Sequence, residues 1–348
     1  MILLAFFLLG CSPKRPQWIT DALLKQRLAK AKPSAKKIIQ KTIPVQTKFF
    51  CHEKKIPISD GVEICHINEK VRHRRLLSKT KILEEKFFVK DALGQKLLDS
   101  TFTQFHANGN LSQGSVYKRG KKHGPFELRN NAGKVIYQSR YWRGLQDGKS
   151  NRWDAQGRLL EEAFWVRGVR HGQETIWDKE GYKVKETPYH DGLIHGIHYL
   201  WKQERLLLKI TYNLGELDGP SEQYWPNGKL KQKVPYVKGH IHGQVKSFFS
   251  SGKRENTIPY IEGKRNGLAR GWFENGKKDF MLKYRNGHRE GVSKVWSEKG
   301  RLLKKRHWKS DQLHGQQIDY QPHKKTYTYE NDICISKQCI EPLENANP

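Results

Sequence analysis

Glycines and aromatic residues recur at fixed positions along most of this chain, with short apolar segments between them. From about residue 109 onward, one series of glycines returns every 23 or 24 residues, and a second series follows four residues behind it. An aromatic residue stands three positions before nearly every first-series glycine, and another stands five positions after nearly every second-series glycine. The intervals have the length of β-strands, and glycine readily adopts the positive φ of hairpin turns. The pattern therefore predicts one β-hairpin per repeat.

The glycines of both series are predicted to be structural turn residues. They are Gly120, Gly124, Gly144, Gly148, Gly168, Gly172, Gly192, Gly196, Gly215, Gly219, Gly239, Gly243, Gly263, Gly267, Gly287, Gly291 and Gly315. A third series of glycines marks the other turn of each repeat. In three repeats this glycine follows asparagine, at residues 108–109, 227–228 and 275–276, and Asn-Gly is a direct hairpin signal. This third series is missing in the fourth unit, which is one residue short and has residues 201–205 in its place.

A single hairpin cannot bury its apolar face, so stacked neighbours must supply the stability. We therefore expect an all-β fold, an elongated single-layer antiparallel β-meander of about nine 24-residue hairpin repeats over residues 101–323. The remaining segments are interpreted as a signal peptide (1–10), a basic tether (11–48), an N-terminal capping region (49–100) and a C-terminal tail (324–348).

The repeat resembles the bacterial variant of the MORN repeats. Its core reads aromatic-x-x-Gly-x-x-His/Asp-Gly, clearest at residues 236–243, and an Asn-Gly-Lys turn accompanies it. The resemblance covers roughly residues 105–320 and implies a long, twisted, single-layer antiparallel sheet. It also implies a role in scaffolding or membrane association, and many bacterial relatives carry an antitoxin-like label.

The first eleven residues read as a targeting signal. An apolar run at residues 2–9 is too short to span a bilayer but suits the core of a signal peptide. Leu8-Leu9-Gly10-Cys11 resembles a bacterial lipobox, which implies cleavage before Cys11 and lipidation of its thiol. No Lys or Arg precedes the apolar run, which departs from the pattern. The alternative is an ordinary cleaved signal with an incidental cysteine.

The other four cysteines fall into two local pairs near the ends of the mature chain. An exported compartment permits disulfides, and the simplest connectivity is Cys51–Cys65 and Cys334–Cys339. Zinc binding is the alternative, although no Cys-x-x-Cys spacing occurs.

Composition limits the class of protein further. Apolar residues make up 36% of the chain, which is too few for one thick core. Aromatic residues make up 11%, which is too many for a disordered polycation. The net charge of +30 favours phosphate, carboxylate or anionic membrane partners without choosing among them.

Basic residues directly follow the third-series glycine in most repeats. These anion-binding candidates are Lys134, Arg158, Lys229, Lys253, Lys277 and Arg301. With the second aromatic series close by, such an edge is suited to stack on rings and to pair with phosphate or carboxylate. The alternative is that the aromatics are the packing ladder of the sheet, while the basic residues are solvated and discourage edge aggregation.

No enzyme signature stands out from the repeat. Histidine precedes the second-series glycine in several units, but successive copies lie about 9.5 Å apart, whereas zinc holds its ligands at about 2 Å. Residues 144–150 resemble a phosphate-binding loop with one residue too few. We therefore predict no catalytic residues, no metal and no cofactor.

The sequence favours a non-enzymatic lipoprotein, anchored by its lipid in the bacterial outer membrane. Its repeat array is expected to be a binding or scaffold surface for an anionic envelope polymer or lipid, or for an envelope protein. One alternative is an antitoxin-like or nucleic-acid-binding repeat protein, with nucleic acid the less expected partner. A second alternative is an enzyme of envelope polymers with an unrecognised site in residues 49–100.

Overall fold

A computed structural model describes residues 56–58, 62–67, 70–76, 82–336 and 339. The chain divides into two compact units, Met1–Lys48 and Phe49–Pro348, and all described residues belong to the second. The predictions for the signal peptide, for Cys11, for the basic tether and for the Cys51–Cys65 pair lie outside the described residues. No helix among the described residues is long and apolar enough to cross a membrane.

The second unit is one antiparallel sheet. Its first strands are β1 (Ile56–Ile58), β2 (Val62–Ile67), β3 (Lys70–Leu76), β4 (Ile82–Lys90) and β5 (Lys96–Phe105). The long repeat strands are β6 (Leu111–Lys118), β7 (Lys121–Arg129), β8 (Val135–Trp142), β10 (Gly148–Trp153), β11 (Leu159–Val166), β13 (Gly172–Trp177), β14 (Lys183–His190), β16 (Gly196–Lys202), β17 (Arg205–Asn213), β18 (Glu216–Tyr224), β19 (Leu230–Val237), β21 (Gly243–Phe248), β22 (Arg254–Ile261), β24 (Gly267–Trp272), β25 (Lys278–Arg285), β27 (Gly291–Trp296), β28 (Leu302–Lys309), β30 (Gly315–Asp319) and β31 (Lys325–Glu330). Two-residue segments open many of the returning strands: β9 (Leu145–Gln146), β12 (Val169–Arg170), β15 (Leu193–Ile194), β20 (His240–Ile241), β23 (Lys264–Arg265), β26 (His288–Arg289) and β29 (Gln312–Leu313), with β32 (Ile333–Cys334) as the last strand.

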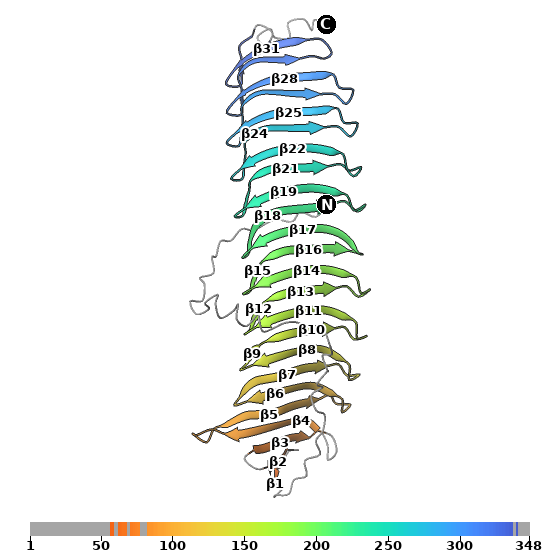
Figure 1. Ribbon diagram of the computed structural model, residues 1–348, viewed down its shortest axis with the longest axis vertical. Helices are drawn as coiled ribbons and strands as arrows, with labels where there is room; N and C mark the ends of the chain where they lie inside the picture. The colour runs from red at the N-terminus through yellow and green to blue at the C-terminus, as the bar shows by residue number, and fades with distance from the viewer. Residues whose placement is uncertain (1–55, 59–61, 68–69, 77–81, 337–338, 340–348) are drawn as a thin grey trace, which may run out of the picture. The chain divides into compact units, whose positions relative to one another are not determined.

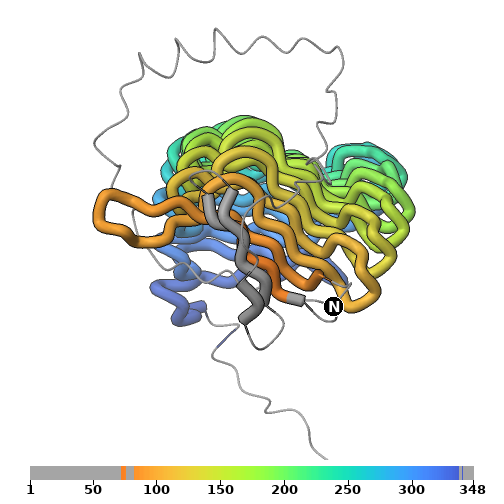
Figure 2. The backbone as a smooth tube through the Cα atoms, turned by 90° about the horizontal axis from the view of Figure 1, so that it is seen from below, coloured from red at the N-terminus to blue at the C-terminus, as the bar shows by residue number. Residues whose placement is uncertain are grey.

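The strands stack in chain order as a meander, which confirms the predicted fold class (Figure 1). Viewed along the stack, successive hairpins are rotated relative to one another, as expected for twisted strands (Figure 2). The sheet does not begin with the first recognisable repeat. Strand β5 pairs with β4 on one side and with β6 on the other, so the predicted capping region contributes strands to the same sheet. Strands β31 and β32 likewise extend it into the predicted tail, where Cys334 and Cys339 form the expected disulfide.

The first-series glycines lie in two-residue hairpin turns. In a typical unit Trp142 pairs with Leu145, and the intervening Arg143 and Gly144 both have positive φ, as a type I′ turn requires. The amide of Gly144 donates to the carbonyl oxygen of Lys122 in the preceding hairpin, at 2.7 Å. Each such turn is therefore tied to its neighbour by a backbone hydrogen bond.

The second-series glycines lie in β-bulges, not in the loops that the sequence predicts. Around Gly243 the pairing changes from Tyr236↔Ile241 to Gln232↔Ser247, so residues are inserted on one strand of the pair. Gly243 has a φ of 108°, and a Cβ there would lie 3.3 Å from the ring of Pro235. The bulge thus requires glycine for its backbone conformation and for the close approach of the preceding strand.

The core is a narrow file of small side chains along one face of the sheet. Ser150, Ala163 and Thr187 are at most 5% exposed there, although the sheet is a single layer. First-series aromatic residues cover them, and the indole nitrogen of Trp165 donates to the Ser150 hydroxyl at 2.9 Å. Trp308 makes the same contact with Ser293 at 2.7 Å. This aromatic series is the packing ladder of the sheet.

Candidate functional site

The opposite face of the sheet carries a continuous file of directly paired residues, which we call the central row. Each member is the register partner of the next, so their side chains share one face. Its members are Glu127, Gln138, Asn151, Glu162, Thr175, Glu186, Tyr199, Lys209, Glu222, Lys233, Lys246, Thr257, Arg270, Met281, Lys294, Lys305 and Ile318.

The first half of the central row is acidic, and its carboxylates are paired. Glu127 is 3% exposed and accepts a hydrogen bond from Arg129 Nε at 2.8 Å. Glu222 binds the ammonium of Lys233 at 2.7 Å, and this hydrogen bond lowers the pKa of the Glu222 carboxyl. Glu162 and Glu186 form ion pairs with lysines on the same face. The charges in this half are therefore balanced within the sheet.

The second half of the row is basic and contains no acidic member. We call its four cations the cationic strip: Lys246, Arg270, Lys294 and Lys305. Within the described part of the chain none of the four forms an ion pair or a side-chain hydrogen bond. Lys294 and Lys305 are direct register partners, so two like charges face each other. Asp279 lies on β25, between the strands that carry Arg270 and Lys294. Burial raises the pKa of its carboxyl, and no cation of the strip lowers it.

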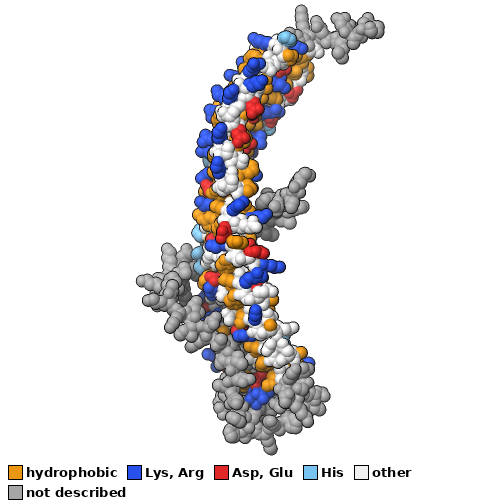
Figure 3. All heavy atoms as spheres, turned by 90° about the vertical axis from the view of Figure 1, so that its right-hand side faces the viewer, with side chains coloured by type: hydrophobic (Ala, Val, Ile, Leu, Met, Phe, Trp, Pro, Cys, Tyr) orange, Lys and Arg blue, Asp and Glu red, His pale blue; other side chains and the backbone are white. Residues whose placement is uncertain are grey.

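The predicted anion-binding residues lie instead at the edge that carries the longer loops, where Lys and Arg side chains recur (Figure 3). Lys229 Nζ donates to the Ser251 carbonyl at 2.6 Å, Lys253 Nζ to that of Glu274 at 3.0 Å, and Lys277 Nζ to that of Lys299 at 3.0 Å. Each of these carbonyls belongs to the next repeat, so we call these side chains the lysine braces.

The other predicted members of this edge also have local partners. Lys134 Nζ reaches the Gln156 carbonyl at 3.4 Å, which makes it a fourth brace. Arg158 forms an ion pair with Asp154 inside its own loop, at 2.7 Å. The amide of Arg301 donates to Ser297 Oγ at 3.1 Å. The lysine braces and the ion pair of Arg158 give this edge a structural role that sequence reasoning missed.

Asparagine in the Asn-Gly-Lys turn contributes a second tie between repeats. The side chain of Asn227 accepts the amide of Lys229 at 3.1 Å and donates to the Ser250 carbonyl at 2.7 Å. Asn275 makes the equivalent pair of bonds with Lys277 and Glu298. The recurrence of Asn, Gly and Lys in this turn therefore has one physical explanation, because all three residues build the contact to the following hairpin.

In four units the residue before the second-series glycine accepts a hydrogen bond from the next repeat: Asp147, His171, His195 and Glu290. His195 Nδ1 accepts the amide of Leu214 at 3.3 Å, and Glu290 accepts that of Ser310 at 3.0 Å. Asp147 receives the amide of Arg167 in the same way, at 3.3 Å. These donors are the first residues of type I′ turns. His, Asp and Glu thus alternate here because each offers an acceptor. Among the described residues, no cluster of His, Cys, Asp or Glu is arranged to hold a metal ion.

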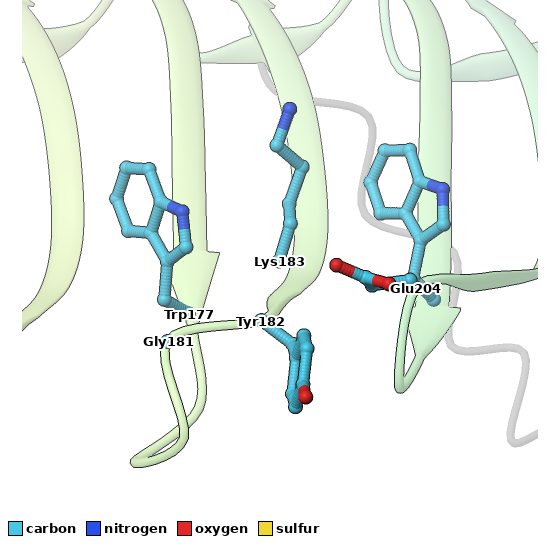
Figure 4. A pocket seen from close by; sticks show the side chains of 6 residues that line it. Trp177, Gly181, Tyr182, Lys183 and Glu204 are labelled. Atoms are coloured by element: carbon cyan, nitrogen blue, oxygen red, sulfur yellow. The ribbon is translucent and has the colours of Figure 1, made fainter.

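The second aromatic series borders the central row on the side of the longer loops. At the short fourth unit, Trp177, Lys183 and Trp201 line a notch of about 360 Å³. Trp177 and Lys183 project into it from neighbouring strands (Figure 4). Tyr182 and Glu204 complete the lining, and Tyr182 is 38% exposed. The ammonium of Lys183 lies 5.5 Å from the centre of the Trp201 ring.

Comparison with known proteins supports the repeat class. The MORN repeat variant matches residues 217–238, which span most of β18 and all of β19. The matched segment is thus similar to a MORN repeat variant, and the other units share its period and turn residues. No curated protein matches the chain.

Some solved structures match the chain at low TM-scores. The crystal structure of TcdB2-TccC3-Cdc42 matches with 12% identity over 78% of this chain and 19% of that one, at a TM-score of 0.19. The Tc holotoxin pore of Photorhabdus luminescens matches with 13% identity over 78% of this chain and 17% of that one, at a TM-score of 0.16. The chain spans about a fifth of the length of these chains.

Proposed function

We propose that this protein is a non-enzymatic lipoprotein of the bacterial outer membrane, and that its MORN-variant array is a binding surface for an anionic envelope component. The observation that carries the proposal is the cationic strip. In the part of the chain that the structure describes, its four charges have no intramolecular partner, whereas the carboxylates at equivalent positions of the first half are paired. Strands that are two apart in a sheet lie about 9.5 Å apart, so the charges form an extended file. An extended polyanion fits such a file better than a small anion does.

Binding to a file of this kind depends on salt. Lys246, Arg270 and Lys294 lie two strands apart in turn, about one Debye length at 0.1 M salt, so their contacts are almost independent and the affinity grows with their number. Lys305 lies directly beside Lys294 and adds to the same local charge. The predicted edge residues Lys134, Lys229, Lys253 and Lys277 are secondary in this proposal, because their ammonium groups already bind carbonyl oxygens.

The test is co-sedimentation of the purified chain with lipopolysaccharide at low and at high salt. We expect binding that weakens steeply as the salt concentration rises. Binding that is unchanged by salt, or no binding at low salt, contradicts the proposal. A separate test addresses the anchor: a fatty-acid analogue fed to cells should label the wild-type protein and not Cys11→Ser.

An envelope protein is a second candidate partner, and a different surface favours it. Along the type I′ turns, the face that carries the central row exposes a margin of apolar side chains. Its members include Trp142, Leu145, Phe164, Val166, Val169 and Leu193. Each is 36–50% exposed. Contiguous exposed apolar residues of this kind mark protein interaction sites. Cross-linking in native cells from a photoreactive residue at position 142 tests this candidate.

A further inference from the structure

The fourth unit departs from the repeat at the turn between β16 and β17. In the preceding unit Trp177 pairs with Lys183, so a five-residue loop joins the strands. In the fourth unit Lys202 pairs with Arg205, so only Gln203 and Glu204 lie in the turn, both with positive φ. The missing residue thus converts a projecting loop into a tight hairpin.

This shorter turn opens the edge of the array at one place. In regular units a brace such as Lys229 crosses to the carbonyl of the following loop. Here the corresponding position holds Tyr182. The notch of about 360 Å³ between Trp177 and Trp201 lies on one side of this tyrosine, and a second pocket of about 260 Å³ lies on the other. Places where a regular pattern breaks while the fold persists are candidates for function.

The notch combines flat apolar rings with a balanced set of charges. The indoles of Trp177 and Trp201 both line it, and Tyr199 stacks on Trp201 with 5.2 Å between ring centres, which fixes that indole. Lys183 is paired with Glu186, and Glu204 adds another carboxylate at the rim. The site therefore offers hydrogen-bond donors and acceptors without an excess of positive charge, in contrast to the cationic strip.

We infer that this notch binds a ring of a neutral hexose oligosaccharide. The apolar face of a pyranose stacks on an indole, and its hydroxyl groups match the ammonium of Lys183 and the carboxylate of Glu204. The volume lies within the range of small-ligand pockets, about 300–1,000 Å³. The inference extends the proposed function, since both treat the array as a binding surface, but it uses different residues and different forces.

The test is titration of the full chain with chitotetraose and with cellotetraose in 0.5 M salt, where contacts to the cationic strip are screened. We expect at least one of the two probes to bind, and Trp177→Ala or Trp201→Ala to weaken its binding about tenfold. Trp153→Ala and Trp272→Ala are matched controls, since these residues belong to the same aromatic series in units with regular loops. They should leave the affinity unchanged.

A second variant separates the notch from general effects on folding. Insertion of Asn-Gly-Lys into the turn at residues 203–204 should rebuild a longer loop, close the notch and abolish binding while the melting temperature is retained. Failure of the wild type to bind either probe overturns the inference, as does equal weakening by Trp272→Ala. Salt-sensitive binding to lipopolysaccharide would still stand in that case, so this failure is distinguishable from failure of the proposed function.

Discussion

The two halves of the central row have the same backbone and opposite charge. In the first half, carboxylates such as Glu127 and Glu222 are paired with neighbouring cations. In the second half, Lys246, Arg270, Lys294 and Lys305 lie in the same register without a partner among the described residues. Glu127 is buried, so its ion pair with Arg129 offsets the cost of removing the carboxylate from water. Like charges on opposed residues are destabilising, however, and an anionic partner would relieve the repulsion between Lys294 and Lys305. The comparison favours the second half as the proposed binding surface.

Charge reversal should give the largest effect. Replacement of all four residues of the cationic strip by Glu should abolish binding to lipopolysaccharide at low salt. Each lost contact is worth about 1 kcal/mol near an anionic surface, so the affinity should fall at least about a thousandfold. Equilibrium co-sedimentation provides the measurement. The matched control replaces Lys149, Lys183, Lys209 and Lys233 of the first half by Glu. If the control loses as much affinity as the strip variant, the comparison between the halves fails.

Backbone substitutions should affect both halves alike. Gly148→Val in the first half and Gly243→Val in the second place a β-branched residue at a φ of 103° and 108°, respectively. Such strain costs about 1–3 kcal/mol, and chemical denaturation should show a similar loss of unfolding free energy for each variant. Lys238→Ala, at the adjacent type I′ turn, should cost less. A stable Gly243→Val variant would contradict the bulge assignment.

Removal of a lysine brace should have a smaller effect on stability. Lys229→Met keeps the aliphatic stem, which packs on Gly252, and removes the ammonium that binds the Ser251 carbonyl. One hydrogen bond of this kind contributes about 0.5–1.5 kcal/mol. Lys202→Met, in the tight turn of the fourth unit, is the control and should leave the melting temperature unchanged. Equal effects of the two substitutions would show that Lys229 is solvated, as the alternative interpretation of the sequence holds.

Between pH 7.5 and pH 5.5, a pH dependence of stability should arise at His198, in the first half. Burial and the nearby charge of Lys185 lower the pKa of His198 below its ordinary value of 6.5. The folded state therefore disfavours the imidazolium, so the contribution of His198 is complete above pH 6.5 and is lost as the pH falls below it. His198→Gln should show a smaller loss of unfolding free energy than the wild type between pH 7.5 and pH 5.5. His242→Gln is the control in the second half, and a reduction as large there would contradict the assignment.

The sequence predicts the sheet well because glycine reports backbone conformation directly. The positions of Gly144 and Gly243 mark a positive φ, and the structure has it at both. The sequence does not distinguish the type I′ turn at Gly144 from the bulge at Gly243, because the two require glycine for similar reasons. The boundaries at residues 100 and 323 were also set by visible periodicity, whereas the pairing of strands continues through less regular segments.

The candidate site was less predictable, because side chains act across repeats. The contact from Lys229 to the Ser251 carbonyl depends on how far one hairpin is displaced from the next, and spacing along the chain does not give that displacement. Lys246, Arg270 and Lys294 each stand three residues after a second-series glycine, so the 24-residue period could have identified them. Lys305 lies on the alternate strand and joins them only through the register of the sheet. The irregular unit at residues 201–205 was visible, and a search for departures from the repeat would have directed attention to the notch.

The most direct test of the binding surface is the salt dependence of affinity for lipopolysaccharide. The wild type, the variant with the four strip residues replaced by Ser, and the variant with Lys149, Lys183, Lys209 and Lys233 replaced by Ser are compared across a salt series. The logarithm of the binding constant should fall linearly with the logarithm of the salt concentration, and its slope should decrease by roughly three to four in the strip variant. The first-half variant should keep the wild-type slope. Equal slopes in all three proteins would contradict the assignment of the cationic strip as the binding surface.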